Sequence, residues 1–208
     1  MRGKLVAFDG LPEKDFILES FASNVVSIAT DGKTTIMLFE EGGWAFTAGL
    51  PTALRNELDA RKTLPAYVAL GSQNRWFLTF ANGAETWNGP DEMSRVLQDS
   101  ALVEQHRGVR TVAFGSTFDS YFIVFNDGWW CRGDLPDGLK IAIQRLGAEP
   151  SFKCVSLGPD GEWYLETLDG KAGWGGVPNH FDHFIRRVKK DIKFIDFGKD
   201  KSYLIRYS

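Results

Sequence analysis

The sequence has few of the residues that build metal sites and disulfide frameworks. It contains two cysteines and three histidines in 208 residues. Cys131 and Cys154 lie in apolar, strand-like segments without CxxC spacing, which favours buried reduced thiols in an intracellular protein over a disulfide or a nucleophile. His180 and His183 are spaced to share a helix face, but no third or fourth ligand is evident beside them. We therefore predict no metal and no cofactor.

Long apolar runs and an excess of one charge are also missing. The chain has no apolar run at its N-terminus, and no apolar run reaches the roughly 18 residues that a membrane span needs. The sequence therefore predicts neither a signal peptide nor a membrane span. We expect a cytoplasmic location. The net charge is −3, and the local basic cluster at residues 186–190 is typical of the solvated end of a helix. We expect no nucleic-acid partner, no membrane partner and a monomer.

What the sequence does have is a repeat. One copy reads GWGGVPNHFDHFIRRV and ends at Val188. Each copy contains an Asx-Gly turn, a short aromatic-bearing strand, a glycine, a proline and an amphipathic helical segment. A period of about 40 residues is typical of propellers and solenoids, and here the proline recurs at Pro12, Pro51, Pro90, Pro136 and Pro178.

The two ends of the chain share one copy of this repeat. Residues 192–208 match the first half of a unit, whereas residues 1–21 match the second half. A solenoid has no reason to divide a unit in this way, but a closed ring does, because pairing of the terminal strands removes exposed edges. We predict one domain over residues 1–208, with units at 23–64, 65–108, 109–150, 151–190, and 191–208 joined with 1–22.

Each unit is predicted to contain three short antiparallel strands and one short helix. The middle strands are apolar on both faces, as in the segment Tyr121-Phe122-Ile123, which indicates a strand packed between neighbours. The fold class is therefore mainly β with short helices, a five-bladed β-propeller-like closed ring. The first strands carry a small or polar residue that we expect at the ring axis: Ser27, Ala69, Ala113, Ser156 and Asp196.

Three segments resemble the repeats of β-propeller lectins of the tectonin and tachylectin kind. They are Trp174 to Pro178, Ile195 to Gly198, and Tyr203. The resemblance implies a propeller that binds carbohydrate. This sequence adds a helical segment after the proline, where those repeats have a short connection or a fourth strand. The cyclic order also resembles that of pentein-like α/β-propellers, but no Cys-His-acid arrangement matches their catalysis.

Four tryptophans and one carboxylate are candidate ligand-binding residues. Trp87 and Trp174 occupy equivalent third-strand positions, and Trp44 and Trp130 lie in the same strand of other copies. Their indole rings suit either packing between blades or a ligand surface. Asp196 is the single charge expected at the axis, either as a site residue or as a hydrogen-bonded carboxylate in the channel.

No nucleophile elbow, P-loop or dinucleotide fingerprint is present, and we predict no catalytic residues. The predicted function is a non-catalytic binding module, a protein-interaction scaffold. The alternative is a multivalent carbohydrate-binding lectin, so the partner is a protein or a glycan. The hairpin loops SQNR, STFD, PDGE and KDKS share polarity but not identity, which weighs against five equal sugar sites. An enzyme would need one cluster of unlike polar groups at a central opening, with a titratable residue whose pKa is perturbed.

Overall fold

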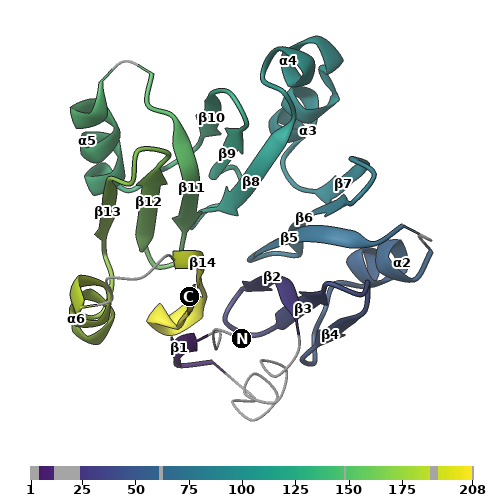
Figure 1. Ribbon diagram of the computed structural model, residues 1–208, viewed down its shortest axis with the longest axis horizontal. Helices are drawn as coiled ribbons and strands as arrows, with labels where there is room; N and C mark the ends of the chain where they lie inside the picture. Colours follow the sequence, from purple (N-terminus) through teal and green to yellow (C-terminus); the bar gives the residue numbers. More distant parts are fainter. Residues whose placement is uncertain (1–4, 12–23, 61–62, 148, 188–191, 208) are drawn as a thin grey trace.

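The computed structural model describes residues 5–11, 24–60, 63–147, 149–187 and 192–207. Five antiparallel sheets of three strands each lie around a common centre (Figure 1). Their strands, grouped by sheet in chain order, are β2 (Val25–Thr30), β3 (Thr35–Phe39) and β4 (Trp44–Phe46); β5 (Pro65–Gly71), β6 (Arg75–Phe80) and β7 (Glu85–Asn88); β8 (Val109–Phe114), β9 (Tyr121–Phe125) and β10 (Trp129–Arg132); β11 (Phe152–Leu157), β12 (Trp163–Thr167) and β13 (Ala172–Gly175); and β14 (Ile192–Phe197), β15 (Tyr203–Tyr207) and β1 (Leu5–Asp9). The prediction of a mainly β chain with three antiparallel strands in each unit is confirmed.

Helices follow the third strand in the units where the structure describes this region. They are α2 (Thr52–Ala60), α3 (Asp91–Gln98), α5 (Asp137–Leu146) and α6 (Asn179–Arg187), and a proline directly precedes all four. Leu54 and Leu58 of α2 are buried, as their helical spacing predicts. The helix predicted after Pro12 lies outside the described residues.

One helix was not predicted. The segment after α3, interpreted from the sequence as a long connection, contains α4 (Ser100–Gln105). The Asp99 side chain accepts a hydrogen bond from the Leu102 backbone N–H at 3.1 Å, which satisfies a donor at the helix start. The local capping signal was present in the sequence, but the six-residue helix buries none of its side chains and has too few apolar residues to show a periodic pattern.

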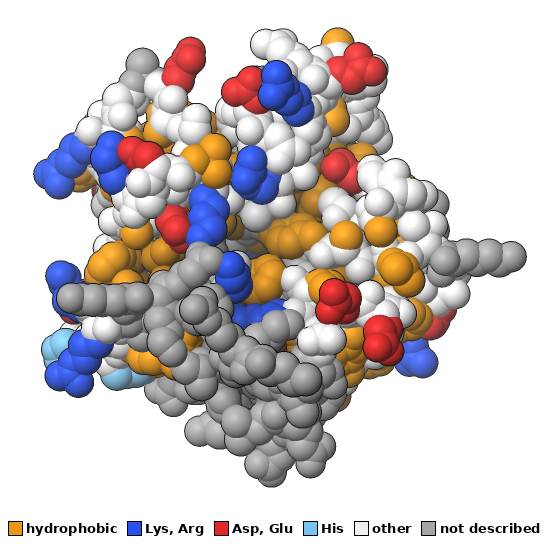
Figure 2. Space-filling model, in the orientation of Figure 1, with side chains coloured by type: hydrophobic (Ala, Val, Ile, Leu, Met, Phe, Trp, Pro, Cys, Tyr) orange, Lys and Arg blue, Asp and Glu red, His pale blue; other side chains and the backbone are white. Residues whose placement is uncertain are grey.

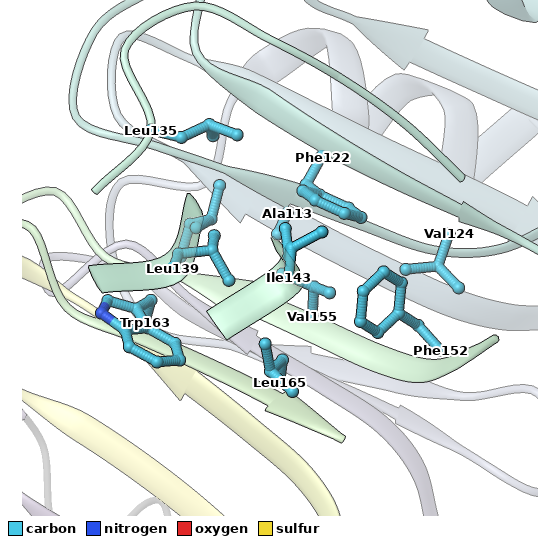
Figure 3. Close-up of a cluster of buried hydrophobic side chains, with 11 residues drawn as sticks. Ala113, Phe122, Val124, Leu135, Leu139, Ile143, Phe152, Val155, Trp163 and Leu165 are labelled. Atoms are coloured by element: carbon cyan, nitrogen blue, oxygen red, sulfur yellow. The ribbon is translucent and has the colours of Figure 1, made fainter. Parts of the chain in front are cut away.

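The core is divided among the spaces between neighbouring sheets. Between the third and fourth sheets, Phe122 of β9 packs edge-on against Phe152 of β11 at 5.7 Å between ring centroids, in a cluster that also contains Trp163 of β12 and Leu139 of α5 (Figure 3). Similar clusters lie between the first and second sheets, the second and third, and the fourth and fifth. The middle strands are accordingly buried on both faces, as predicted.

The fifth sheet is built from both ends of the chain. β15 pairs with β14 on one side and with β1 on the other, and Leu5 lies opposite Tyr207. This sheet also contacts the first one: Leu204 packs with Ile28 and Met37, and the Arg206 guanidinium donates to the Val25 carbonyl. The predicted pairing of N-terminal and C-terminal strands is confirmed.

The small residues of the innermost strands need one correction. Ala69, Ala113, Ser156 and Asp196 lie opposite equivalent positions of their middle strands. In the first sheet the equivalent residue is Ala29, which lies opposite Ile36, whereas Ser27 lies opposite Leu38. The predicted position was displaced by two residues. Ser27 instead accepts a hydrogen bond from the Val68 N–H of the neighbouring sheet at 3.1 Å.

Candidate ligand-binding site

A pocket of about 240 Å³ lies at the centre of the molecule, where the five innermost strands meet. Residues from β2, β5, β8, β11 and β14 all line it. Much of the wall is aliphatic or aromatic, contributed by Val26, Ile28, Val68, Leu70, Val112, Val155, Phe194 and Ile195. An apolar cavity with a few polar groups is the usual composition of a small-ligand site.

The rim of this pocket is set by a repeated backbone irregularity. Each innermost strand has a register shift one residue after its start, which leaves one residue without a partner in the middle strand. Such bulges redirect a side chain and are common beside functional sites. The five unpaired residues are Val26, Ala66, Arg110, Lys153 and Lys193, and all five line the pocket.

The bulge therefore places basic side chains at the pocket from three consecutive sheets. Arg110, Lys153 and Lys193 belong to the third, fourth and fifth sheets, while the first and second sheets contribute Val26 and Ala66. Lys and Arg side chains lie beside an apolar hollow near the middle of the visible face in Figure 2. One part of the rim is thus positively charged and the other is apolar.

The basic residues differ in how they are held. Lys153 Nζ lies 2.9 Å from Glu166 Oε1 and donates to the Ile192 carbonyl at 3.0 Å, so it bridges the fourth and fifth sheets. Arg110 Nε is buried and has no hydrogen-bond partner among the described residues, and the same is true of Thr111 Oγ1. A buried polar atom without a protein partner marks a candidate ligand contact.

Asp196 also lines the pocket, and both of its carboxyl oxygens are engaged by the backbone. Oδ2 accepts from the Thr30 N–H at 2.7 Å, and Oδ1 accepts from the Phe197 N–H at 3.0 Å. Burial raises the pKa of Asp196 to about 8, against these two hydrogen bonds and with a smaller contribution from Asp31. At neutral pH this carboxyl group is therefore mostly protonated.

Cys154 lies in the same wall as an unreactive thiol. Burial raises its pKa to about 12, and Glu166 adds to this effect. The thiolate is the nucleophilic form, so this side chain is poorly suited to covalent catalysis at neutral pH. Cys131 is also a free thiol whose pKa is raised by burial.

The predicted tryptophans lie on outer strands, away from one another in the sheet order. Trp87 pairs with Phe77 and Trp174 with Tyr164, which are equivalent positions of the second and fourth sheets. Trp87 Nε1 donates to Ser94 Oγ at 3.1 Å, and Trp174 Nε1 donates to Asp182 Oδ1 at 2.9 Å. Both indoles thus fasten a third strand to the helix that follows it.

The other two tryptophans occupy different registers. Trp44 lies opposite Leu38 and packs against the cluster between the first and second sheets. Trp130 lies opposite Ile123, one residue away from the position equivalent to Trp87, and is 40% exposed. The structure therefore does not bring the four tryptophans together, and Asp196 lies apart from them at the centre. Their role in ligand binding stays a prediction.

The basic residues of the rim were missed in the sequence. Their signal is a basic residue after an apolar one at the start of three consecutive units, in the segments VRT, FKC and IKF. In a regular strand such a residue is a solvated outward position. The bulge turns it toward the centre, and a bulge has no reliable local signature.

Three other predictions concern the basic cluster at residues 186–190, metal binding and membrane spans. Arg186 lies on α6, where its guanidinium pairs with Asp182 and covers the Trp174 ring, while residues 188–190 are outside the described part. In the described ranges no three His, Cys, Asp or Glu side chains form a group able to hold a metal. No helix in the same ranges is long and apolar enough to cross a membrane.

The fold defines a mainly β protein of five three-stranded sheets around a partly basic central pocket. No family model and no curated protein matches the sequence. Among solved structures, the chain is similar to one titled "YCF48 bound to D1 peptide", with 11% identity and a TM-score of 0.32 over 87% of this chain and 76% of that chain.

Proposed function

We propose that the protein is a non-catalytic binding module, a closed five-bladed propeller that binds a segment of a partner protein at the mouth of its central pocket. The observation that carries this proposal is the fivefold bulge, which places residues from all five innermost strands at one opening. A site shared by all sheets suits a rigid scaffold that presents a preformed surface.

Closure of the ring is supported by the contacts between the first and last sheets. Each innermost strand contacts the next one, and β14 contacts β2. The Thr30 N–H donates to Asp196, and the Lys199 N–H donates to the Asp31 carbonyl at 3.2 Å. These bonds join residues from opposite ends of the sequence.

A non-catalytic role is supported by the chemistry of the pocket wall. The Cys154 thiol is held in its protonated form by burial, and both oxygens of Asp196 accept backbone hydrogen bonds. Neither group is placed to act as a nucleophile or a general base at neutral pH. The remaining wall is mainly apolar or basic, with the hydroxyl groups of Tyr67, Thr111 and Ser156, and this composition suits binding.

The proposal is tested by site-specific crosslinking. Ala66, an exposed rim residue, is replaced with a photo-crosslinking amino acid, and the matched control carries the same group at Arg55 on the outer helix α2. In extracts of the producing cells, we expect a discrete protein adduct from position 66 that is absent at position 55. Equal labelling at both positions, or none at position 66, would contradict binding at the pocket mouth.

The carbohydrate alternative stays a prediction. The Trp87 and Trp174 indole N–H groups already have partners, and the equivalent residues of the first and third sheets are Phe46 and Cys131. This variation does not support five equal sugar sites. A glycan array is the direct test, and a saturable response that is lost on mutation of Trp130 would favour the lectin.

A further inference from the structure

We infer that the central pocket recognises a carboxylate carried on a short apolar stem, with Arg110 binding the carboxylate and the aliphatic wall taking the stem. The inference rests on the proposed function for the location of the site but adds the chemistry of its ligand. Two sources supply this chemistry: the C-terminal residue of a peptide and a free small carboxylic acid.

The charge of the pocket lining selects an anion. Three basic residues line the pocket, and the acidic residue in the lining is Asp196. The two Asp196 oxygens already accept from the Thr30 and Phe197 N–H groups, so this side chain offers little to a cation. Glu166 pairs with Lys153 within the wall, so we assign the anion contact to Arg110.

Arg110 is the residue best placed to bind the anion. Its Nε is buried without a hydrogen-bond partner among the described residues. Oγ1 of the next residue, Thr111, is also buried and also lacks a partner there. A guanidinium offers parallel donors that match the two oxygens of a carboxylate, which a lysine ammonium cannot do. Because Nε has no accessible surface, the carboxylate would accept from the outer nitrogens of the guanidinium, which lines the pocket.

The volume limits the size of the ligand. The cavity of about 240 Å³ is smaller than the roughly 300–1,000 Å³ of pockets for drug-sized ligands. It therefore suits one terminal residue or one small acid and excludes a folded domain or an extended strand. The partly exposed lining residues Val26 and Phe194 favour an apolar stem.

The experiment compares matched ligands on the full chain by isothermal titration calorimetry. The probes are hexanoate against hexanol, and acetyl-Gly-Gly-Leu with a free C-terminal carboxylate against the same peptide amidated. We expect saturable binding of the acids, with the neutral partners at least about tenfold weaker, which corresponds to about 1.4 kcal/mol. Binding of hexanoate but not the peptide assigns the site to free acids, and binding of the peptide assigns it to a protein terminus.

Two rim variants and a control locate the binding. Arg110→Gln should weaken binding of the acids at least about tenfold and leave the neutral probes unchanged, with folding verified by thermal melting. Ala66→Glu places a like charge at the exposed rim and should also weaken the acids. Arg55→Gln, on α2 beside Asp59, should have no effect.

The outcomes separate this inference from the proposed function. Equal affinity for acids and neutral probes, no saturable binding of either acid, or unchanged acid binding in both rim variants would overturn the carboxylate site. A protein adduct from position 66 together with any of these results would retain the proposed function and reject the ligand chemistry.

Discussion

At the scale of single residues, Asp196 links the central pocket to stability. Its pKa is raised by burial from 3.8 to about 8. Between these two values the unfolded chain is ionised while the folded protein keeps its proton, so folding stability falls as pH rises from about 4 to about 8. Below this range, the carboxyl group is protonated in both states and contributes no pH dependence.

Asp196→Asn should remove this loss, because the amide cannot ionise and its oxygen can still accept a backbone hydrogen bond. We expect the free energy of unfolding of the variant, relative to wild type, to increase by at least about 1 kcal/mol between about pH 5 and pH 8, measured by urea denaturation. Asp137→Asn, at a side chain that is 90% exposed, serves as the control and should follow the wild type. A parallel pH profile for wild type and Asp196→Asn would contradict the raised pKa.

At the scale of the strand and its following helix, Trp87 and Trp130 should differ in how much they stabilise the fold. Trp87 stacks with Phe77 at 6.5 Å between ring centroids and donates to Ser94 on α3, whereas Trp130 is 40% exposed. Trp87→Ala should therefore lower the free energy of unfolding by about 2–3 kcal/mol, and Trp130→Ala by less than about 1 kcal/mol. Trp87→Phe, which keeps a ring but loses the hydrogen bond, should lie between them. Denaturant melts of the three variants test this order, and a larger loss for Trp130 would reverse the assignment.

The same scale shows how far the sequence predicts the fold. Periods of two and the Asx-Gly turns located the strands, and a proline followed by helical spacing located α2, α3, α5 and α6. Ser27 was placed two residues from its true register, because Ser27 and Ala29 are both small residues next to Ile28 and the sequence pattern fits either one. The basic rim was missed because its position depends on the bulges, which have no reliable sequence signature.

Arg75 illustrates a second limit of sequence reasoning. From the sequence we noted only the polarity of its loop, SQNR, yet the Arg75 side chain is fully buried. Its guanidinium donates to the carbonyls of Gly115 and Thr117 at 2.7 Å, so it fastens the second sheet to the hairpin of the third. Ser72 in its own hairpin accepts two further bonds, but the other acceptors lie at least 40 residues away in the sequence, and such distant partners leave no local pattern.

At the scale of the whole molecule, the fifth sheet depends on residues from both ends of the chain. β1 contributes one of its three strands and covers the outer edge of β15. Without β1, the edge of β15 would carry unpaired backbone groups, and the cluster that joins Leu204 to the first sheet would lose Leu11. The stability of the fold should therefore depend on a segment that is distant in sequence from most of its contacts.

Deleting residues 1–21 should lower the free energy of unfolding by about 3 kcal/mol or more, or should abolish the cooperative transition. A loss of this size is a large part of the roughly 5–15 kcal/mol typical of domains.

The control for this truncation is a circular permutant. Because Leu5 lies opposite Tyr207, a short Gly-Ser linker can join the ends, and new ends can be opened in the exposed hairpin turn between Asn82 and Gly83. We expect the permutant to unfold cooperatively near the wild-type midpoint, since it keeps every strand pairing of the fifth sheet. A truncated protein as stable as wild type would contradict the closed ring, whereas a destabilised truncation with an intact permutant would show that β1 is required through its pairing with β15.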